Sequence, residues 1–327
     1  MSVRIGVIGV GVMGADHARK LARVVSGADV VAVTDFNVDA ADTLADELGT
    51  RVHHDGFEMI LDAGVDAVVV ATRDDTHAAL VLAALDAGKP VMCEKPLAPT
   101  AAECQAIITA QAAAGRPVDS VAVGFMRRFD PSYVALRDRV ASRESGEPVI
   151  VHCVSRTVDT YPGGDSASSI TNSAIHELDI VPWLLDSPIV EVSYQHGRTS
   201  PNSGARQDPQ LYLLRTTSDV LVTVELFLNA RYGYDTRCEV VMEAGAAALT
   251  LPAQIVTDSE RRRGLAYAAD WIPRFSDAYR IELQEWVDSL DQGRPSTLAG
   301  AEDGLRATLV ADALVRSMHS DGAWIKV

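Results

Sequence analysis

Positive charge is scarce in this chain of 327 residues, which carries 45 acidic residues against 29 basic ones and a formal net charge of -16. A protein that binds nucleic acid through its phosphates, or that docks on an anionic membrane, needs a basic surface. The composition therefore argues against both functions. Lysine is especially rare, because only Lys20, Lys89, Lys95 and Lys326 occur. A lysine at a chemically special position in such a chain needs a functional explanation.

Long apolar runs and paired cysteine motifs are also missing. The apolar run at 65–72 is far shorter than the roughly 20 residues that cross a bilayer. The first residues lack the basic leader and the cleavage site of a signal peptide. The four cysteines show no C-x-x-C spacing: Cys93, Cys104, Cys153 and Cys238. We therefore expect free thiols in a cytoplasmic protein, with no metal site.

The first third of the chain alternates apolar strands with helices. The expected strands are 3–8, 30–34, 51–53, 67–72, 90–94 and 121–125. Because most of them are apolar at nearly every position, they indicate a parallel sheet that is covered on both faces. Right-handed crossovers then make residues 1–125 a doubly wound α/β domain of the Rossmann type.

The pattern changes after residue 125. Several segments now alternate apolar and polar residues, which predicts half-buried antiparallel strands. These strands are expected at 148–157, 189–194, 211–216, 220–228 and 238–244, with helices at 132–141, 174–185, 277–291 and 299–318. Residues 126–327 are therefore predicted to form an α+β domain with an open, mainly antiparallel sheet.

A G-x-G-x-x-G motif follows the first expected strand and opens the first helix. In this context the first glycine permits a tight turn, the second lets the backbone approach a pyrophosphate, and the third allows close packing of helix on sheet. The N-terminus of the helix then offers free N–H groups to the anion. The residues of this candidate dinucleotide site are Gly9, Gly11, Val12, Met13 and Gly14.

Asp35 stands at the end of the second expected strand, 21 residues after Gly14. A carboxylate there accepts hydrogen bonds from ribose hydroxyls and repels a 2′-phosphate. At a separation of about 4 Å the repulsion costs roughly 4 kcal/mol for an effective dielectric constant of about 20. Neither Phe36 nor Asn37 is an arginine that could receive the phosphate. The sequence therefore favours NAD over NADP.

Glu94-Lys95-Pro96 ends the strand at 90–94, at the carboxyl edge where open α/β sheets bind ligands. One of the four lysines thus lies at the mouth of the expected cofactor site. Its ammonium could bond a substrate hydroxyl and favour the alkoxide as hydride leaves. A surface lysine at a strand end is the alternative interpretation.

Asn172 and His176 are four residues apart and share one face of the expected helix, with Asp179 close to the same face. A histidine is a natural proton acceptor when an alcohol is oxidised. General-base catalysis of this kind contributes about 10²- to 10⁴-fold. Taken alone, a structural histidine within the helix is the simpler interpretation.

Together these motifs resemble the glucose-fructose oxidoreductase / inositol dehydrogenase / MocA (Gfo/Idh/MocA) family of NAD(P)-dependent sugar and cyclitol dehydrogenases, over nearly the whole chain. The resemblance rests on residues 9–14, 94–96, 124–130, 176–179 and 232–235. Arg127-Arg128 and the Tyr-Gly-Tyr-Asp sequence at 232–235 resemble inositol 2-dehydrogenases in particular.

The resemblance implies roles for individual residues. Lys95 and His176 would be the catalytic pair, with Asn172 beside them, and Arg127 and Tyr234 would line the polyol pocket. The nicotinamide side of the cofactor would be flanked by Thr72, His77 and Glu94. The resemblance also implies that the second domain binds substrate and supports assembly into a dimer or tetramer, with a homotetramer as our expectation.

Some positions depart from the family pattern. Asn172 stands where an aspartate is usual, and Ser155 and Thr157 stand where His-Arg-Asn is common. Asn172 cannot act as a base, but its amide can donate to and accept from a polyol hydroxyl. The chemistry therefore survives these changes, while the identity of the polyol is less fixed.

The expected activity is NAD-dependent oxidation of myo-inositol to 2-keto-myo-inositol (scyllo-inosose). The alternatives within the same chemistry are scyllo-inositol, a modified cyclitol or an aldose as substrate. An alternative of another class is a non-catalytic regulator that binds NAD and a sugar. Such a protein would be expected to have lost Lys95 or His176, and both are present.

Overall fold

The computed structural model describes residues 2–115, 117, 120–160, 163–250 and 255–327. The chain divides into two compact units: residues 1–126 with 277–308 form the first, and residues 127–276 with 309–327 form the second. The first break thus lies one residue beyond the predicted boundary. The expectation that all of 126–327 forms one domain needs correction, because 277–308 returns to the first unit.

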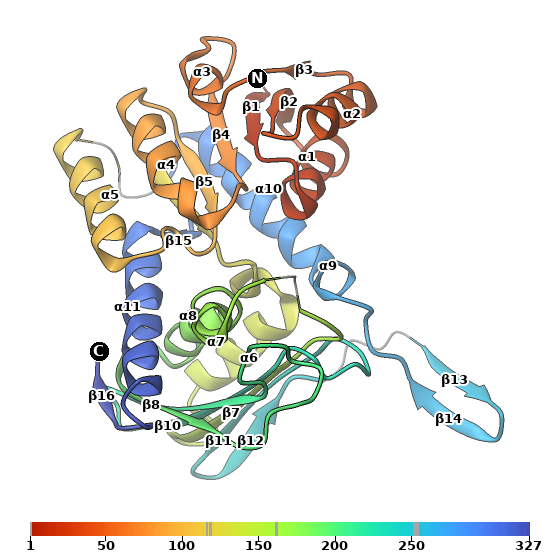
Figure 1. Ribbon diagram of the computed structural model, residues 1–327, viewed down its shortest axis with the longest axis vertical. Coiled ribbons are helices and arrows are strands. Elements are labelled where there is room, and N and C mark those ends of the chain that lie inside the picture. The colour runs from red at the N-terminus through yellow and green to blue at the C-terminus, as the bar shows by residue number, and fades with distance from the viewer. Residues whose placement is uncertain (1, 116, 118–119, 161–162, 251–254) are drawn as a thin grey trace. The chain divides into compact units, whose positions relative to one another are not determined.

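The first unit is built on a seven-stranded sheet with the order β15-β6-β5-β4-β1-β2-β3 (Figure 1). Strands β1 to β6 are parallel, and β15 pairs antiparallel with β6 at one edge. Their bounds are Val3–Ile8, Ala28–Thr34, Arg51–Val52, Ala67–Val70, Val91–Glu94, Val121–Gly124 and Ala299–Gly300. Because β4, β5 and β6 are buried at every position, the predicted doubly wound sheet is confirmed.

Local signals in the sequence set the starts of several helices in this unit. Asn37 and Asp55 cap α2 and α3 by accepting hydrogen bonds from backbone N–H groups, and Thr100 forms a capping box with Glu103 at α5. The helices are α1 (Val12–Arg23), α2 (Val38–Leu48), α3 (Gly56–Leu61), α4 (His77–Asp86), α5 (Ala101–Ala113) and α10 (Ser276–Gln292), with a short 3₁₀ turn at Asp74–Thr76.

Contacts of helix α10 place the late segment 277–308 in the first unit. The side-chain amide of Gln284 accepts from the backbone N–H of Ser26 at 2.8 Å and donates to the carbonyl of Ser26 at 3.0 Å. Val287 on the same helix is fully buried. Amphipathic spacing predicts such a helix, but it does not say which sheet the apolar face will cover.

The second unit contains a seven-stranded sheet with the order β12-β11-β7-β10-β9-β8-β16. Only β10 and β7 pair in parallel, so the predicted mainly antiparallel sheet is confirmed. The strands are β7 (Pro148–Arg156), β8 (Ile189–His196), β9 (Gln210–Thr216), β10 (Leu221–Phe227), β11 (Asp235–Met242), β12 (Gly245–Ala248) and β16 (Ile325–Lys326). A separate exposed hairpin pairs β13 (Val256–Ser259) with β14 (Arg262–Leu265).

Helices α6 (Pro131–Ala141) and α8 (Ile175–Leu185) lie on one side of this sheet in Figure 1. The unit also contains the 3₁₀ turn at Met126–Phe129, the short helices α7 (Ser166–Ser168) and α9 (Trp271–Arg274), and a π-helical turn at Ser169–Ala174 before α8. Helix α11 (Ala301–Met318) begins in the first unit, which includes residues up to Thr308, and ends in the second. In β10 every second residue is fully buried, as at Val222 and Val224, and the residues between them are half-buried. This period of two is the signature of a sheet with one covered face.

Two further observations concern the described residues as a whole. None of their helices is long and apolar enough to cross a membrane. Among these residues, no group of three or more His, Cys, Asp or Glu side chains is arranged to hold a metal ion. All four cysteines are buried and free, as predicted.

Candidate active site

The glycine-rich turn between β1 and α1 has the shape that a dinucleotide needs. Gly9 has φ +88°, and a Cβ there would lie 2.6 Å from the carbonyl oxygen of Ala71. A Cβ on Gly14 would collide with the carbonyl oxygen of Gly9. A Cβ on Gly11 would meet nothing within 4 Å, and no side chain caps the helix that Gly11 begins. The turn therefore leaves open space and backbone N–H groups where a pyrophosphate would bind.

Asp35 is fixed against this turn. Its Oδ2 accepts from the backbone N–H of Val10 at 2.6 Å, and its Oδ1 accepts from the N–H of Asn37 at 2.8 Å. Each carboxylate oxygen keeps further acceptor capacity for a ribose hydroxyl. The side chain is half-buried next to Phe36, which is 94% exposed. The geometry thus fits the acceptor role predicted for Asp35.

Lys95 follows the last residue of β5 and is half-buried. The preceding Glu94 is buried, and its carboxylate lies 2.7 Å from Nε2 of His17 and accepts from the backbone N–H of Lys95 at 3.1 Å. Burial acts to raise the pKa of Glu94, but the hydrogen bond from His17 and the charge of Lys95 outweigh it, so the pKa is lowered. A Cβ on Gly124 would lie 3.3 Å from the Glu94 carboxyl carbon, so a larger residue there would press on this carboxylate.

Thr72 lies in the loop after β4, and His77 begins α4 beyond that loop. His77 is buried, with Nδ1 2.8 Å from the carbonyl oxygen of Pro96 and Nε2 3.2 Å from the carbonyl oxygen of Thr72. The hydroxyl of Thr72 lies 2.7 Å from that of Thr76. The ring of His77 therefore holds backbone segments, and a direct contact between this ring and a cofactor stays a prediction.

Asn172 and His176 begin the main helix of the second unit, but not as expected. Asn172 lies in the π-helical turn Ser169–Ala174, and His176 is the second residue of α8. The expected helix at 174–185 is confirmed as α8, but Asn172 lies in the wider turn before it, so the assumed four-residue α-helical spacing of Asn172 and His176 needs correction. Both side chains are half-buried, which leaves them partly accessible. Single turns of π-helix occur frequently at functional sites.

Two buried ion pairs hold the start of α8. Arg127 pairs with Glu177, and both side chains are 2% exposed. Arg128 donates to Asp179 at 3.0 Å through Nε. Burial by itself lowers the pKa of Arg127, but the adjacent Glu177 carboxylate outweighs it and holds the pKa well above its ordinary value. His176 is thus fixed by the carboxylates that follow it.

Arg127 and Tyr234 were expected to line a polyol pocket. The guanidinium of Arg127 lies 5.6 Å from the ring of Phe275, and the ring of Tyr234 packs edge-on against the same ring at 6.1 Å. Tyr234 is 7% exposed. The structure therefore brings the two residues to one aromatic cluster, and a direct hydrogen bond from Arg127 to a polyol stays a prediction.

Neither His17 nor Glu177 is selected as a site residue by the sequence patterns. Both are buried polar residues whose partners are distant in sequence, at separations of 77 and 50 residues. A signal was present for His17, which lies three residues after Gly14 on the first helix. Its partner could be found only once β5 was placed beside β4, whose other neighbour is β1.

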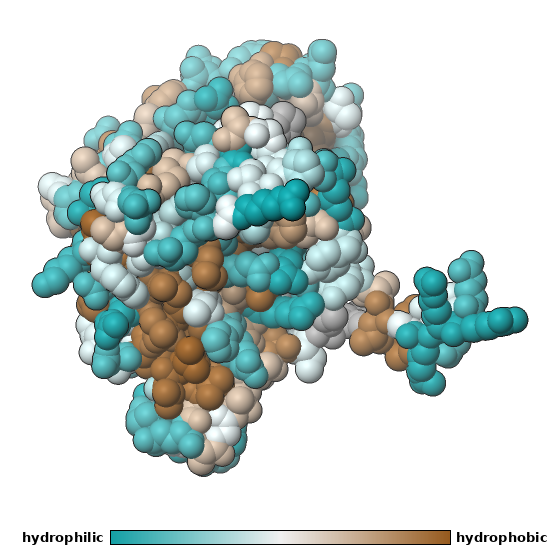
Figure 2. Space-filling model, turned by 60° about the horizontal axis from the view of Figure 1, so that its bottom comes forward, coloured by the Kyte–Doolittle hydropathy of each residue, from teal (hydrophilic) through white to brown (hydrophobic). Residues whose placement is uncertain are grey.

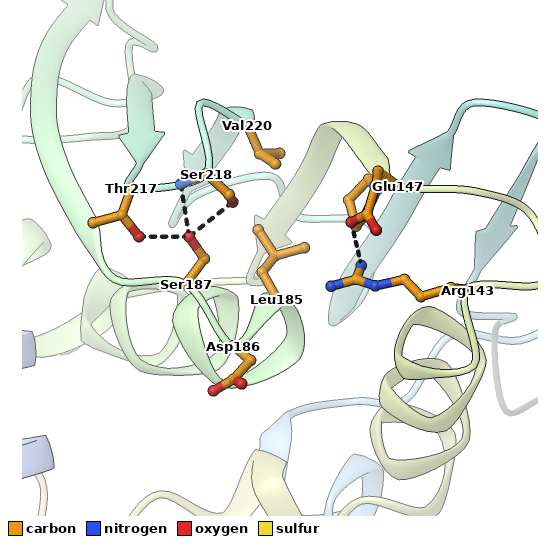
Figure 3. A pocket seen from close by; sticks show the side chains of 9 residues that line it. Arg143, Glu147, Leu185, Asp186, Ser187, Thr217, Ser218 and Val220 are labelled. Atoms are coloured by element: carbon orange, nitrogen blue, oxygen red, sulfur yellow. Dashed lines mark hydrogen bonds and ion pairs between the residues drawn. The ribbon is translucent and has the colours of Figure 1, made fainter.

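A recess of about 310 Å³ in the second unit contains none of the predicted site residues (Figure 3). Its polar wall is a cluster of hydroxyls, in which Ser187 Oγ lies 2.9 Å from Thr217 Oγ1 and 2.8 Å from Ser218 Oγ. Opposite them Arg143 pairs with Glu147. These groups are hydrogen-bonded to one another, so the recess is explained without a ligand.

The first unit and the residues at its glycine turn define a dinucleotide-binding oxidoreductase. Residues 3–122 match the model of the oxidoreductase family with an NAD-binding Rossmann fold, GFO_IDH_MocA, and residues 133–248 match the GFO/IDH/MocA C-terminal domain. The chain belongs to the GFO/IDH/MocA family. The resemblance seen in the sequence and the predicted NAD-binding domain are therefore confirmed.

Similar proteins carry closely related names. The chain is 50% identical to inositol 2-dehydrogenase 2 of Paenarthrobacter aurescens, with 100% of this chain and 99% of the relative covered. It is 47% identical to inositol 2-dehydrogenase 1 of Saccharopolyspora erythraea, with 100% and 97% covered. Among solved structures, myo-inositol dehydrogenase from Lactobacillus casei in complex with NAD(H) and myo-inositol matches with a TM-score of 0.95 at 32% identity, covering 100% of this chain and 97% of that one.

Proposed function

We propose that this protein is an NAD-dependent cyclitol dehydrogenase that oxidises myo-inositol to 2-keto-myo-inositol. The observation that carries the proposal is Lys95 at the carboxyl edge of a sheet whose glycine turn fits a dinucleotide. The named relatives and the myo-inositol complex of the Lactobacillus casei enzyme support the choice of substrate. The retained Lys95 and His176 favour an enzyme over a non-catalytic regulator.

The cofactor would be held by the glycine turn and by Asp35, with Thr72, His77 and Glu94 shaping the region near Lys95. When bound, NAD supplies the acceptor for the hydride that leaves the substrate carbon. The chain's own residues bind the polyol and accept one proton from it. Electrostatic stabilisation of a developing alkoxide is commonly the largest contribution to such catalysis.

Three residues carry the proton transfer in this proposal. Neutral His176 takes the proton from the reacting hydroxyl while the C–H bond of the same substrate carbon breaks. The ammonium of Lys95 stabilises the alkoxide character of the oxygen. The amide of Asn172 orients a hydroxyl by donating and accepting hydrogen bonds. The substrate loses one hydride and one proton, which gives the ketone.

The proposal is tested by mixing the purified protein with NAD and a panel of polyols and following NADH absorbance. We expect the highest kcat/KM with myo-inositol and lower values with scyllo-inositol, a methylated inositol and glucose. A higher kcat/KM for any of the other polyols would replace myo-inositol as the substrate. Absence of NADH with the whole panel would contradict the enzymatic proposal.

Cofactor preference provides a second test. Because Asp35 would repel a 2′-phosphate, we expect kcat/KM with NAD to exceed that with NADP by at least about tenfold, which corresponds to roughly 1.4 kcal/mol. Asp35→Ser should narrow this ratio, whereas Asp39→Ser on α2 is the matched control and should leave it unchanged. Equal kcat/KM values for the two cofactors in the native enzyme would contradict this prediction.

Asn172 provides a test of the departure from the family pattern. A carboxylate near a histidine favours the imidazolium and raises its pKa. In Asn172→Asp the base-competent neutral form of His176 should therefore require a higher pH, and the acidic limb of the kcat/KM profile should move upward. The neutral control Asn172→Ala should show no such shift.

The same substitution should also change the order of polyol preference, because asparagine donates a hydrogen bond and ionised aspartate cannot. The carboxylates of Glu177 and Asp179 are already paired with arginines and do not compete for this role. An unchanged pH profile together with an unchanged substrate order would remove Asn172 from the site.

We further propose that the protein is a cytoplasmic homotetramer that assembles through the uncovered face of the second sheet. That face carries apolar side chains interspersed with polar ones such as Thr223 and Glu225; the apolar ones are Ile150, Val154, Leu211, Leu213, Leu221, Phe227 and Val241. Figure 2, which brings the lower side of Figure 1 forward, shows apolar side chains gathered over one area. Exposed apolar surface rimmed by polar residues is typical of interaction sites.

Light scattering coupled to size exclusion tests the assembly. We expect a tetramer for the native chain and a smaller species for Leu213→Glu. Val38→Glu introduces the same charge at an exposed apolar residue of the first unit and should leave the mass unchanged. A native chain that elutes as a monomer would contradict the proposal.

A further inference from the structure

Two buried histidines flank Lys95 within the first unit, and the reaction described above uses neither as an acid or base. His17 lies in α1 and is 0% exposed, and His77 begins α4 and is 1% exposed. Each ring is hydrogen-bonded to a residue directly adjacent to Lys95. Burying a polar side chain costs free energy unless it is hydrogen-bonded, so the partner of each ring indicates what the ring stabilises.

On the N-terminal side, His17 holds Glu94. Its Nε2 lies 2.7 Å from Oε1 of Glu94, while Oε2 of the same carboxylate accepts the backbone N–H of Lys95. Among the described residues, Nδ1 of His17 has no hydrogen-bond partner. A carboxylate oxygen only accepts, so the ring donates this hydrogen bond through Nε2. The ring is also packed edge-on against Tyr279 at 5.6 Å.

On the C-terminal side, His77 holds Pro96. Its Nδ1 lies 2.8 Å from the carbonyl oxygen of Pro96, and its Nε2 lies 3.2 Å from the carbonyl oxygen of Thr72. Carbonyl oxygens only accept hydrogen bonds and a neutral imidazole has a single N–H, so the ring donates to Pro96, which is the shorter of the two contacts. The ring thereby holds the segment after Lys95 against the start of α4.

We propose that His17 and His77 are positioning residues that fix Lys95 from its two sides. His17 acts through Glu94, and His77 acts through Pro96. The backbone at Lys95 is then held before and after the residue, so its ammonium starts from one defined place at the sheet edge. Displacing a catalytic group by about 1 Å can cost about 10²-fold in rate, which makes such support functionally important.

This inference rests on the role of Lys95 in the proposed function. Neither imidazole is exposed, so neither reaches the substrate, and their effect must pass through the residues beside Lys95. The inference therefore predicts a loss of turnover with little loss of cofactor affinity. A merely structural role would lower thermal stability and NAD affinity together.

The test compares His17→Ala and His17→Gln in the full-length protein with NAD and myo-inositol. For His17→Ala we expect kcat to fall by about 10- to 100-fold, with the dissociation constant for NAD close to the native value. The kinetic isotope effect on kcat with myo-inositol deuterated at the reacting carbon should increase, because hydride transfer becomes slower. His17→Gln supplies an N–H at the position of Nε2 and should recover most of the lost turnover.

His77→Asn keeps a side-chain N–H that can donate to the carbonyl of Pro96 and should recover more turnover than His77→Ala. The matched control is His53→Gln, which alters another histidine–carboxylate pair of the same unit, in which His53 Nε2 lies 3.1 Å from Asp62. This control should leave kcat and the isotope effect unchanged. If His17→Ala does not fold, His17→Asn is compared with His17→Gln in its place. The asparagine side chain is shorter and reaches less far toward Glu94 than the glutamine side chain.

The outcomes separate this inference from the proposed function. If Lys95→Met retains native kcat, the role of Lys95 itself is wrong. If Lys95→Met loses activity while folded His17→Ala and His77→Ala keep native kcat, the positioning role is overturned. Equal activity of His17→Gln and His17→Asn, or a fall in kcat that is matched by weaker NAD binding, also overturns it.

Discussion

His176→Ala is expected to lower kcat by about 10²-fold or more, because loss of a general base removes an interaction that forms in the transition state. The affinity for NAD should stay close to the native value, since the glycine turn and Asp35, which are proposed to bind it, belong to the first unit. The acidic limb of the pH profile should also disappear, because the group that titrates there is gone. Steady-state kinetics across pH, with NAD binding measured separately, provide the check.

The control for this variant is His319→Ala, which removes an exposed histidine from the last part of the second unit. It should leave kcat and the pH profile unchanged. If His176→Ala turns over at a near-native rate, another group takes the proton, and the assignment of His176 as base is wrong.

Arg127→Met is expected to lower the free energy of unfolding by about 3–5 kcal/mol, because it leaves the carboxylate of Glu177 buried without its charged partner. The cost arises from the unpaired charge rather than from lost volume, since methionine fills much of the same space. Equilibrium urea unfolding measures the change. The double variant Arg127→Met/Glu177→Leu removes both charges and should recover most of the loss.

The matched comparison is Arg4→Met, which breaks the exposed ion pair between Arg4 and Asp66 in the first unit. Because exposed pairs are screened by water and salt, this change should have a much smaller effect than Arg127→Met. A small loss of stability in Arg127→Met, or no recovery in the double variant, would show that the buried pair is not what holds the start of α8.

The sequence predicted the first unit well because its signals are local. Strand β1, the glycine turn and α1 occur in direct succession, so spacing alone identifies them, and Asp35 follows at the end of the next strand. The short strand at 51–53 was also expected, and β3 occupies Arg51–Val52. By contrast, α10 and β15 return to the first unit from far along the chain, and periodicity does not reveal which sheet a helix or strand joins.

The candidate site was predictable where one residue type marks the chemistry. Lys95 stood out because lysine is rare, and His176 stood out because a histidine titrates near neutral pH. The supporting residues were not visible in the same way. The roles of His17 and Glu177 depend on partners that only the fold brings next to them. The π-helical turn at Asn172 depends on packing, which residue spacing in the sequence does not predict.

The central claim is that the chain moves a hydride from a cyclitol carbon to NAD, and deuterium transfer tests it most directly. The protein is incubated with NAD and myo-inositol deuterated at carbon 2, and both products are examined by mass spectrometry and NMR. We expect the deuterium to appear at the nicotinamide ring of the reduced cofactor and 2-keto-myo-inositol to form in equal amount. Reduced cofactor without deuterium, or no reduced cofactor under conditions in which the folded protein binds NAD, would contradict the claim.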